Sequence, residues 1–221
     1  MKTLKEIGIE HKTDKATVHD FTDLYEKYYS SFRNDTVKIL EIGVYMGASI
    51  RMWYDYFSNG MIYGMDDCSI TENSITPESI KVLENDRIKI FIGDQKNREH
   101  LKKLIAGYGK EFDTIIDDGY HFQEYQQVSL GFLFPYVKSK GVYVVEDLCP
   151  LNRTKEGWGL KDFVNFSDNT NNILEDFITT KKIVSPYMTE DEMTYLNENI
   201  EGIKIYVVEK DSNIIAFIKK K

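Results

Sequence analysis

Five short apolar runs, separated by stretches with helical periodicity, constrain the fold of this 221-residue chain more than any other feature. Strands that alternate with helices form βαβ units, and such units build a parallel sheet. The runs are continuously apolar, which is typical of strands that are covered on both faces. The predicted strands occupy residues 37–44, 61–67, 87–95, 112–119 and 141–148. We expect helices between them at residues 48–57, 77–84, 97–108 and 122–137.

The two ends of the chain depart from this alternation. Near the C-terminus, "IKIYVVEK" and "NIIAFIKK" flank the turn sequence "DSN", so we expect an antiparallel hairpin that closes one edge of the sheet. Before it, residues 188–200 predict an acid-rich helix, and residues 149–186 predict a lid-like insertion that begins with a long polar loop. Aromatic residues at helical spacing over 22–32 predict a helix in the N-terminal cap segment, 1–35. We expect a single domain over residues 1–221.

Charge and cysteine content narrow the class of protein. The net charge is −8, which argues against a general nucleic-acid binder, because such proteins usually carry a basic stripe. Cys68 and Cys149 lie far apart and in no metal-binding spacing, as in proteins from reducing compartments. No cationic-then-apolar leader opens the chain, and no apolar run approaches the roughly 20 residues of a membrane span. We therefore expect a cytoplasmic protein without a membrane partner.

Each of the five predicted strands ends in acidic residues. In an open parallel sheet, ligands bind at the carboxyl ends of the strands. Like charges held together there are costly unless a cation or a hydrogen-bonded ligand offsets them. The acidic strand ends therefore predict a ligand site along one edge of the sheet. The acids are Glu41, Asp66, Asp67, Asp94, Asp117, Asp118, Glu146 and Asp147.

The turn "EIGVYMGAS" (41–49) follows the first predicted strand and contains two glycines, but it lacks the G-x-G-x-x-G dinucleotide fingerprint. Glycine allows close approach of the backbone to a ligand, although a tight turn without a ligand would also need it. Asp66, at the end of the next strand, can accept hydrogen bonds from both hydroxyls of a ribose. NAD and S-adenosylmethionine both carry that ribose. Glu41, before the first glycine, suits the sulfonium compound better than a pyrophosphate.

Asp118, Glu146 and Asp147 end two neighbouring strands and can converge on Mg²⁺, which prefers oxygen ligands. The cation makes a bound hydroxyl more acidic, and a neutral His121 nearby could accept its proton. Two of these residues also fit simpler roles when each is taken alone. Asp118 could be a helix N-cap, and His121 could be a satisfied polar residue in the first turn of a helix.

Several long motifs resemble those of one enzyme family and occur in its order. They are "TDKATVHDFTDLYEKYY" (13–29), "LEIGVYMGASIRMWYDYF" (40–57), "GDQ" (93–95), "IIDDGYH" (115–121) and "LFPYVKSKGVYVVEDL" (133–148). The chain resembles the metal-dependent sugar O-methyltransferases of the macrocin and mycinamicin O-methyltransferase type. These are class I S-adenosylmethionine methyltransferases, so the resemblance implies a Rossmann-like α/β fold with a mostly parallel seven-stranded sheet.

The resemblance also implies roles for individual residues. The cofactor S-adenosylmethionine would contact Glu41, Gly43 and Ser49 in the first turn, Asp66 at the ribose, Asp94 and Gln95 beside the adenine, and Thr17 in the cap segment. Asp117 would support this site rather than bind metal. The metal ligands would be Asp118, Glu146 and Asp147, and His121 would be the general base. His19 and Tyr25 would help to cover the site, or be a loop residue and a core tyrosine. Met52, Trp53 and Phe57 are assigned to the core.

The chain departs from the family at Ala16 and Tyr120, where a glycine and a serine are usual. Tyr120 would crowd or stack on the acceptor, for which we expect a vicinal diol on a sugar, a nucleotide sugar or another sugar-containing small molecule. Trp158 could touch that acceptor or anchor its own loop, and a homo-oligomer is possible. The alternatives are a catechol-type methyltransferase and a non-catalytic binding protein on the same fold. A nicotinamide-dependent dehydrogenase ranks last, because the dinucleotide fingerprint is missing.

Overall fold

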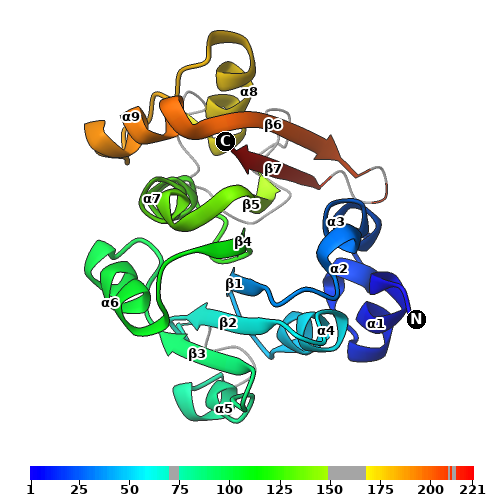
Figure 1. The fold of residues 1–221 in the computed structure, drawn as a ribbon. Coiled ribbons are helices and arrows are strands. Elements are labelled where there is room, and N and C mark those ends of the chain that lie inside the picture. The colour runs from blue at the N-terminus through cyan, green and yellow to red at the C-terminus, as the bar shows by residue number, and fades with distance from the viewer. Residues whose placement is uncertain (70–74, 149–167, 209, 211–212) are drawn as a thin grey trace.

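A seven-stranded sheet runs through the centre of the computed structural model, in the order β3-β2-β1-β4-β5-β7-β6 (Figure 1). The structure describes residues 1–69, 75–148, 168–208, 210 and 213–221. The strands are β1 (Lys38–Ile42), β2 (Met61–Asp66), β3 (Ile88–Ile92), β4 (Phe112–Asp117), β5 (Val137–Leu148), β6 (Ile200–Val207) and β7 (Ile214–Lys220). β1 to β5 pair in parallel with their neighbours, and β7 pairs antiparallel with both β5 and β6. The predicted parallel sheet with an antiparallel C-terminal hairpin is confirmed.

Successive residues of the central strands point to opposite faces of the sheet, and both faces are buried. In β4, Ile115 belongs to one hydrophobic cluster and Ile116 to the other. In β5, Tyr143 and Val145 lie on the face of Ile115, whereas Val144 lies on the face of Ile116. The continuous apolar runs of the sequence are therefore strands that are covered on both sides.

Two groups of helices supply those covers. Figure 1 shows α1 to α4 on the right of the sheet, with α6 and α7 on its left. The Ile116 face packs against α1 (Leu4–His11), α3 (Thr22–Tyr29), α4 (Ala48–Tyr56) and α5 (Pro77–Lys81). The Ile115 face packs against α6 (Arg98–Tyr108), α7 (Gln123–Leu133), α8 (Thr170–Thr180) and α9 (Glu190–Asn199). The shorter helical segments are α2 (Asp14–Thr17), η1 (Ser30–Phe32) and η3 (Phe134–Tyr136).

Side chains that cap the helices explain where several of them begin. Thr3 and Glu6 form a reciprocal capping box at the start of α1, and Thr189 and Glu192 form another at the start of α9. The side chain of Asn97 accepts hydrogen bonds from two main-chain N–H groups in the first turn of α6. These contacts satisfy N–H groups that have no partner within the helix.

The N-terminal segment forms three helices, more helix than its aromatic spacing predicts, and α1 packs against α4, α2 and α3. Tyr25 and Tyr29 of α3 are buried, and both rings contact Trp53 of α4 edge-on. Met52, Trp53 and Phe57 have no exposed surface, so their assignment to the core is confirmed. This packing attaches the N-terminal segment to the Ile116 face of the sheet.

Some predicted boundaries shift. β5 begins at Val137, before the expected residue 141, and its register with β4 is irregular around the left-handed Lys140 (φ 66°). The helix predicted at 122–137 therefore ends earlier, at Leu133. Within the expected insertion 149–186, α8 is a helix that buries Ile173, Leu174 and Phe177. Residues 149–167, with Cys149 and Trp158, and most of the "DSN" turn lie outside the described residues.

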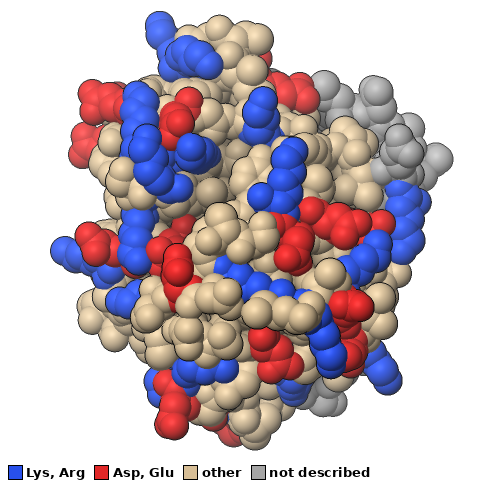
Figure 2. All heavy atoms as spheres, turned by 45° about the vertical axis from the view of Figure 1, so that its right-hand side comes forward, with Lys and Arg blue, Asp and Glu red and all other residues tan. Residues whose placement is uncertain are grey.

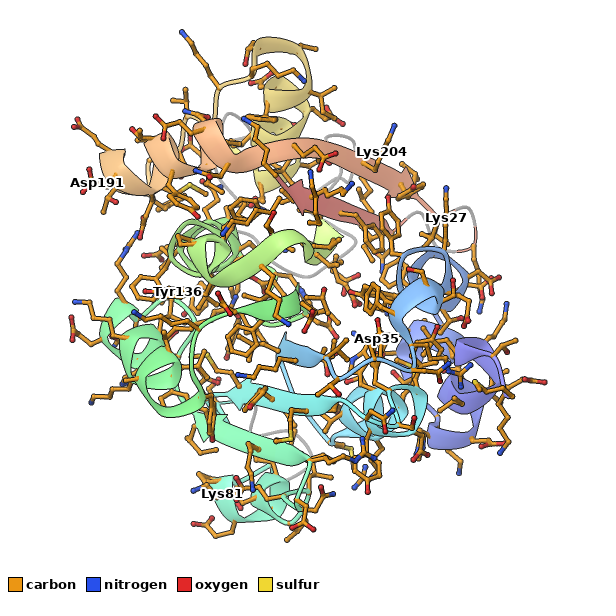
Figure 3. The ribbon with its side chains drawn as sticks, viewed as in Figure 1. Lys27, Asp35, Lys81, Tyr136, Asp191 and Lys204 are labelled. Atoms are coloured by element: carbon orange, nitrogen blue, oxygen red, sulfur yellow. The ribbon has the colours of Figure 1, made fainter. Side chains whose placement is uncertain are left out.

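Charged side chains lie mainly at the periphery. Figure 3 shows Lys27, Lys81, Asp191 and Lys204 pointing away from the helices and strands that carry them, and all four are exposed. On the face drawn in Figure 2, basic and acidic side chains are interspersed among the described residues. None of the helices described by the structure is long and apolar enough to cross a membrane.

Candidate active site

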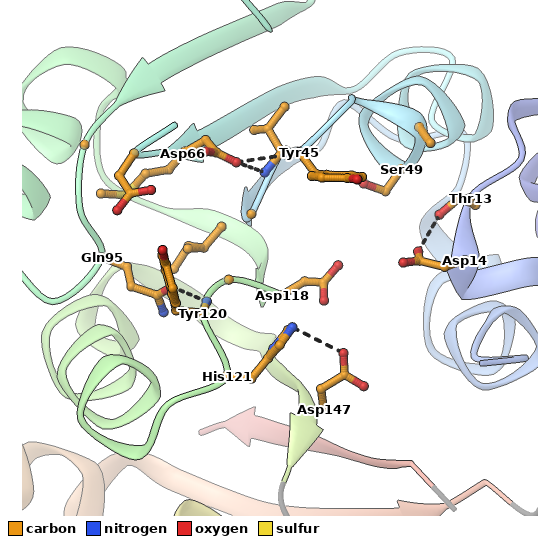
Figure 4. A pocket seen from close by; sticks show the side chains of 18 residues that line it. Thr13, Asp14, Tyr45, Ser49, Asp66, Gln95, Asp118, Tyr120, His121 and Asp147 are labelled. Carbon is orange, nitrogen blue, oxygen red and sulfur yellow. Dashed lines mark hydrogen bonds and ion pairs between the residues drawn. The ribbon is translucent and has the colours of Figure 1, made fainter. Parts of the chain in front are cut away.

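The carboxyl ends of β1 to β5 surround a cavity of about 290 Å³ (Figure 4). Ligand pockets commonly begin at about this volume, roughly 300 Å³. Thr13 and Asp14 from the N-terminal segment complete its wall. The predicted site residues in the wall are Gly43, Ser49, Asp66, Gln95, Asp118, His121 and Asp147. The predicted site residues outside the wall are Thr17, Glu41, Asp94, Asp117 and Glu146.

The turn after β1 contains a glycine because it packs closely against the loop after β4. Gly43 has a φ of +89°, and a Cβ there would lie 1.9 Å from the main-chain oxygen of Asp118. The carboxylate of Asp66 accepts hydrogen bonds from the N–H groups of Val44 (2.8 Å) and Tyr45 (2.9 Å). Asp66 therefore holds the turn in place and also faces the cavity, where Figure 4 shows it beside Tyr45.

Glu41 lies beneath the wall rather than in it. Its buried carboxylate accepts hydrogen bonds from Ser49 (2.7 Å) and from the indole of Trp53 (3.2 Å). Burial raises the pKa of Glu41, while Lys15, whose Nζ lies 3.4 Å away, opposes that rise. Glu41 can therefore reach a ligand only through Ser49, which lines the cavity.

Gln95 connects the ends of β3 and β4. Its amide nitrogen donates to Asp117 (2.9 Å), and its oxygen accepts from the main-chain N–H of Tyr120 (2.9 Å). Asp117 is buried, accepts a further bond from Ser129, and supports the loop from below. Asp94 accepts a bond from the N–H of Lys96 in a local turn (2.9 Å).

Thr17 is exposed, and its hydroxyl donates to the carbonyl of Thr13 at the start of α2 (2.9 Å). In this structure its side chain does not reach the cavity. Two residues near it, Thr13 and Asp14, line the wall instead. The "TDK" segment is therefore correctly predicted to lie at the cavity, but Thr13 and Asp14 line the wall, and Thr17 does not.

Asp118, His121 and Asp147 meet at the opposite side of the cavity from Asp66 (Figure 4). Each offers one ligand atom, and these three atoms lie within 4.8 Å of one another. His121 Nε2 is 3.5 Å from Asp147 Oδ2, and the other oxygen of Asp147 accepts a bond from Asn213 (2.6 Å). Carboxylate oxygens and an imidazole at this separation can hold a divalent cation.

Two members of this group have a left-handed backbone. His121 (φ 54°) and Asp147 (φ 51°) are among nine non-glycine residues with positive φ in the part of the chain that the structure describes. Such residues cost roughly 1–3 kcal/mol each, and they cluster at functional sites. The surrounding structure therefore holds these two side chains at the cavity at the expense of stability.

His121 has the protonation state of a base. Burial lowers the pKa of its imidazole below the ordinary value, and Asp147 only partly opposes this shift. The imidazole is therefore neutral at pH 7 and can accept a proton. Its buried Nδ1 has no hydrogen-bond partner among the described residues.

Glu146 lies behind the cavity, in contact with residues of the N-terminal segment. Its carboxylate accepts hydrogen bonds from the hydroxyl of Tyr25 and from the ammonium of Lys15 (2.9 Å). Burial raises the pKa of Glu146 to about 7, although Lys15 acts against that rise. The structure thus brings Asp118 and Asp147 together at the cavity and places Glu146 one layer deeper.

Sequence reasoning missed Lys15 and Asn213. Lys15 stands inside the "TDK" motif, but lysines are almost never fully buried, so its type alone predicts a solvated side chain. Asn213 belongs to the "DSN" turn, where asparagine is common for reasons of turn geometry alone. Only the fold shows that both side chains hold acids of the site.

No model of a known protein family matches the chain. It is 31% identical to mycinamicin VI 2''-O-methyltransferase of Micromonospora griseorubida, over 98% of this chain and 52% of that protein. It is 38% identical to demethylmacrocin O-methyltransferase of Streptomyces fradiae, over 66% of this chain and 36% of that protein. The chain thus spans about half the length, or less, of these curated relatives.

Among solved structures, the chain resembles the MycE methyltransferase from the mycinamycin biosynthetic pathway, in complex with Mg, SAH and mycinamycin VI. The TM-score is 0.75 with 28% identity, over 99% of this chain and 54% of that one. The sheet order, the helices on both faces and the cavity at the strand ends define the fold of a class I methyltransferase. Within that class, the chain is a homologue of the sugar O-methyltransferases of the macrocin and mycinamicin type, and the resemblance seen in the sequence is confirmed.

Proposed function

We propose that the chain transfers a methyl group from S-adenosylmethionine to a hydroxyl of a sugar or sugar-containing small molecule, with the help of Mg²⁺. The observation that carries this proposal is the group of Asp118, His121 and Asp147. It faces a cavity whose other side is formed by the glycine turn and Asp66. The named homologues and the complex with Mg and SAH support the same activity.

The glycine-turn side of the cavity would hold the cofactor. Asp66 would accept hydrogen bonds from the ribose hydroxyls, and Gly43 would let the turn pack against the Asp118 loop at the wall of the cofactor site. Gln95 would lie near the adenine. Ser49, whose hydroxyl donates to Glu41, would lie near the sulfonium group of the cofactor. Thr17 and Asp94 would act indirectly, through Thr13 and through the turn that positions Gln95, and Asp117 would fix Gln95 from below.

The opposite side of the cavity fits a divalent cation. Asp118 and Asp147 supply carboxylate oxygens within 4.8 Å of each other, and such oxygens are the ligands that Mg²⁺ prefers. We propose Asp118, Glu146 and Asp147 as the residues that hold Mg²⁺. When bound, the cation would polarise the acceptor hydroxyl and offset the carboxylate charge.

His121 would act as the general base. Its neutral imidazole would accept the hydroxyl proton as the acceptor oxygen forms its bond to the methyl carbon and the carbon–sulfur bond breaks. Asp147, next to Nε2, would orient the ring and stabilise the imidazolium that forms. The strained backbone of both residues would keep them in the geometry that this step needs.

The acceptor would enter beside Tyr120. This side chain lines the cavity, stacks on Phe122, and its hydroxyl lies 2.7 Å from that of Ser69. A vicinal diol on a sugar or nucleotide sugar would offer two oxygens to one cation. We further propose that segment 1–35 caps the site, because Thr13 and Asp14 are in the cavity wall.

The first test is thermal unfolding of the purified protein with S-adenosylmethionine, S-adenosylhomocysteine or NAD, each with and without Mg²⁺. Binding to the native state raises stability by mass action. We expect stabilisation by the two sulfur compounds and by Mg²⁺, and none by NAD. No shift with millimolar sulfur compound would reject the methyltransferase and leave the non-catalytic binding protein.

Matched variants assign the response to the site. Asp118→Asn should abolish the shift with Mg²⁺. Asp113→Asn removes a carboxylate at the other end of the same strand, where it pairs with Lys138, and should retain that shift. An acceptor screen follows, and methylation of catechols but of no sugar would replace the sugar acceptor with an aromatic one.

A further inference from the structure

Lys15 is buried in an unusual environment. Its side chain is 1% exposed, and its ammonium contacts Asp118, Glu146 (2.9 Å) and Glu41 (3.4 Å). The ammonium therefore lies among three acids of the strand ends, and it has no role in the methyl transfer proposed above.

A second buried lysine shows that the fold can bury an ammonium by other means. Lys220 donates to the main-chain carbonyls of Phe134 (3.3 Å), Pro135 (2.8 Å) and Val137 (2.7 Å). These acceptors are neutral, whereas the side-chain partners of Lys15 are acidic. The partners of Lys15 therefore offset the positive charge of the ammonium, whereas those of Lys220 only accept its hydrogen bonds.

The acids around Lys15 are not neutralised by it. Glu41, Asp118, Glu146 and Asp147 gather at adjoining strand ends, and the ammonium contacts three of these four carboxyl groups. The ammonium of Lys15 thus contacts two of the proposed metal ligands, Asp118 and Glu146, at the same time.

We propose that Lys15 is a built-in counter-ion that competes with the divalent cation for Asp118 and Glu146. This inference rests on the proposed function, which supplies the cation. Binding of the metal has to displace the ammonium from these two acids, and Glu41 is the remaining partner to which it can turn. Lys15 is a positioning residue here, because it acts through the metal ligands.

The displacement has a direct route to the cavity. Lys15 belongs to α2, and the two residues before it, Thr13 and Asp14, are in the cavity wall. The side chain that the metal would displace therefore follows directly after two residues of the cavity wall.

The test is calorimetric titration of metal-free protein with Mg²⁺, for the wild type, Lys15→Met and Lys220→Met. Removal of a competing charge next to the ligands should tighten Mg²⁺ binding at least about tenfold in Lys15→Met. Lys220→Met loses a buried ammonium without touching the acids, so its Mg²⁺ affinity should equal that of the wild type. Thermal unfolding of the same proteins should show that Lys15→Met gains more stability from Mg²⁺ than the wild type gains.

Equal or weaker Mg²⁺ binding in Lys15→Met would overturn the competition. If the wild type binds neither Mg²⁺ nor S-adenosylhomocysteine, the proposed function itself fails, so the two failures are distinct. Should Lys15→Met fail to fold without metal, Lys15→Met/Glu41→Gln is compared with Glu41→Gln, because Glu41 contacts Lys15 but is not a proposed metal ligand. Loss of Lys15 should again tighten Mg²⁺ binding in that pair, and no change there would also reject the inference.

Discussion

Two acid pairs end neighbouring strands, yet the structure uses them differently. Asp117 ends β4 and Asp118 follows it, whereas Glu146 and Asp147 lie near the end of β5. In both pairs the second acid faces the cavity and the first is buried. Asp117 is held by the neutral side chains of Gln95 and Ser129, but Glu146 is held by Lys15 and Tyr25.

Strand register explains the difference. Asp117 pairs with Val145, so Glu146 comes one residue further along the sheet edge. Because side chains alternate, Asp117 points to the α7 face and Glu146 to the face covered by α3. One face offers neutral donors and the other offers a cation. Two similar motifs therefore acquire different electrostatic surroundings from a one-residue offset.

The largest effect on activity should come from His121, which lies at the cavity beside the second acid of each pair. His121→Asn removes the proposed base and keeps a residue that tolerates the left-handed backbone. We expect kcat to fall about 10²–10⁴-fold, the usual contribution of general base catalysis, with little change in melting temperature. Steady-state kinetics and calorimetry on the same preparation measure both, and an unchanged kcat would remove His121 from the mechanism.

The buried acids should differ in their contribution to the stability of the metal-free protein. Glu146→Gln breaks a buried ion pair and should cost about 3–5 kcal/mol. Asp117→Asn disturbs hydrogen bonds to neutral donors and should cost about 1–3 kcal/mol. Urea unfolding in the presence of a chelator compares the two variants. Equal losses would mean that the charge of Lys15 adds nothing to the support of Glu146.

Tyr120 comes shortly after the first acid pair, and its substitution should change acceptor binding less than the loss of His121 changes kcat. Tyr120→Phe keeps the ring against Phe122 and loses only the contact with Ser69, so KM for the acceptor should change less than about threefold. Tyr120→Ser restores the usual family residue and opens the wall of the cavity. It should broaden the range of accepted sugars in a competition assay, and an unchanged acceptor profile would remove Tyr120 from specificity.

The smallest effect concerns a third acid pair, Asp66 and Asp67, after β2. Burial and these two acids raise the pKa of the Cys68 thiol to about 11. Its alkylation by iodoacetamide at pH 8 should therefore be slow, on the order of 100-fold below that of an ordinary thiol. Asp67→Asn should accelerate it only a few-fold, measured on a Cys149→Ser background. No acceleration would leave burial as the sole cause.

The sequence was sufficient for features that depend on local pattern. The five apolar runs, the Gly43 turn and the acids that meet at the strand ends follow from periodicity, from glycine conformation and from parallel pairing. The side of the sheet to which Glu146 points depends on register, which the acid pairs alone do not specify. The burial of Lys15 depends on acids brought from distant strands, and the helix α8 is concealed by its polar start.

The contact between Lys15 and Glu146 spans 131 residues of chain, which has a consequence for synthesis on the ribosome. At roughly 5–20 residues per second, the nascent N-terminal segment waits on the order of ten seconds for β5 to emerge. Glu41 is made much sooner and is the first of its acids to become available. The N-terminal segment therefore completes its docking only long after it has been translated, and until then its apolar helices need shelter from aggregation.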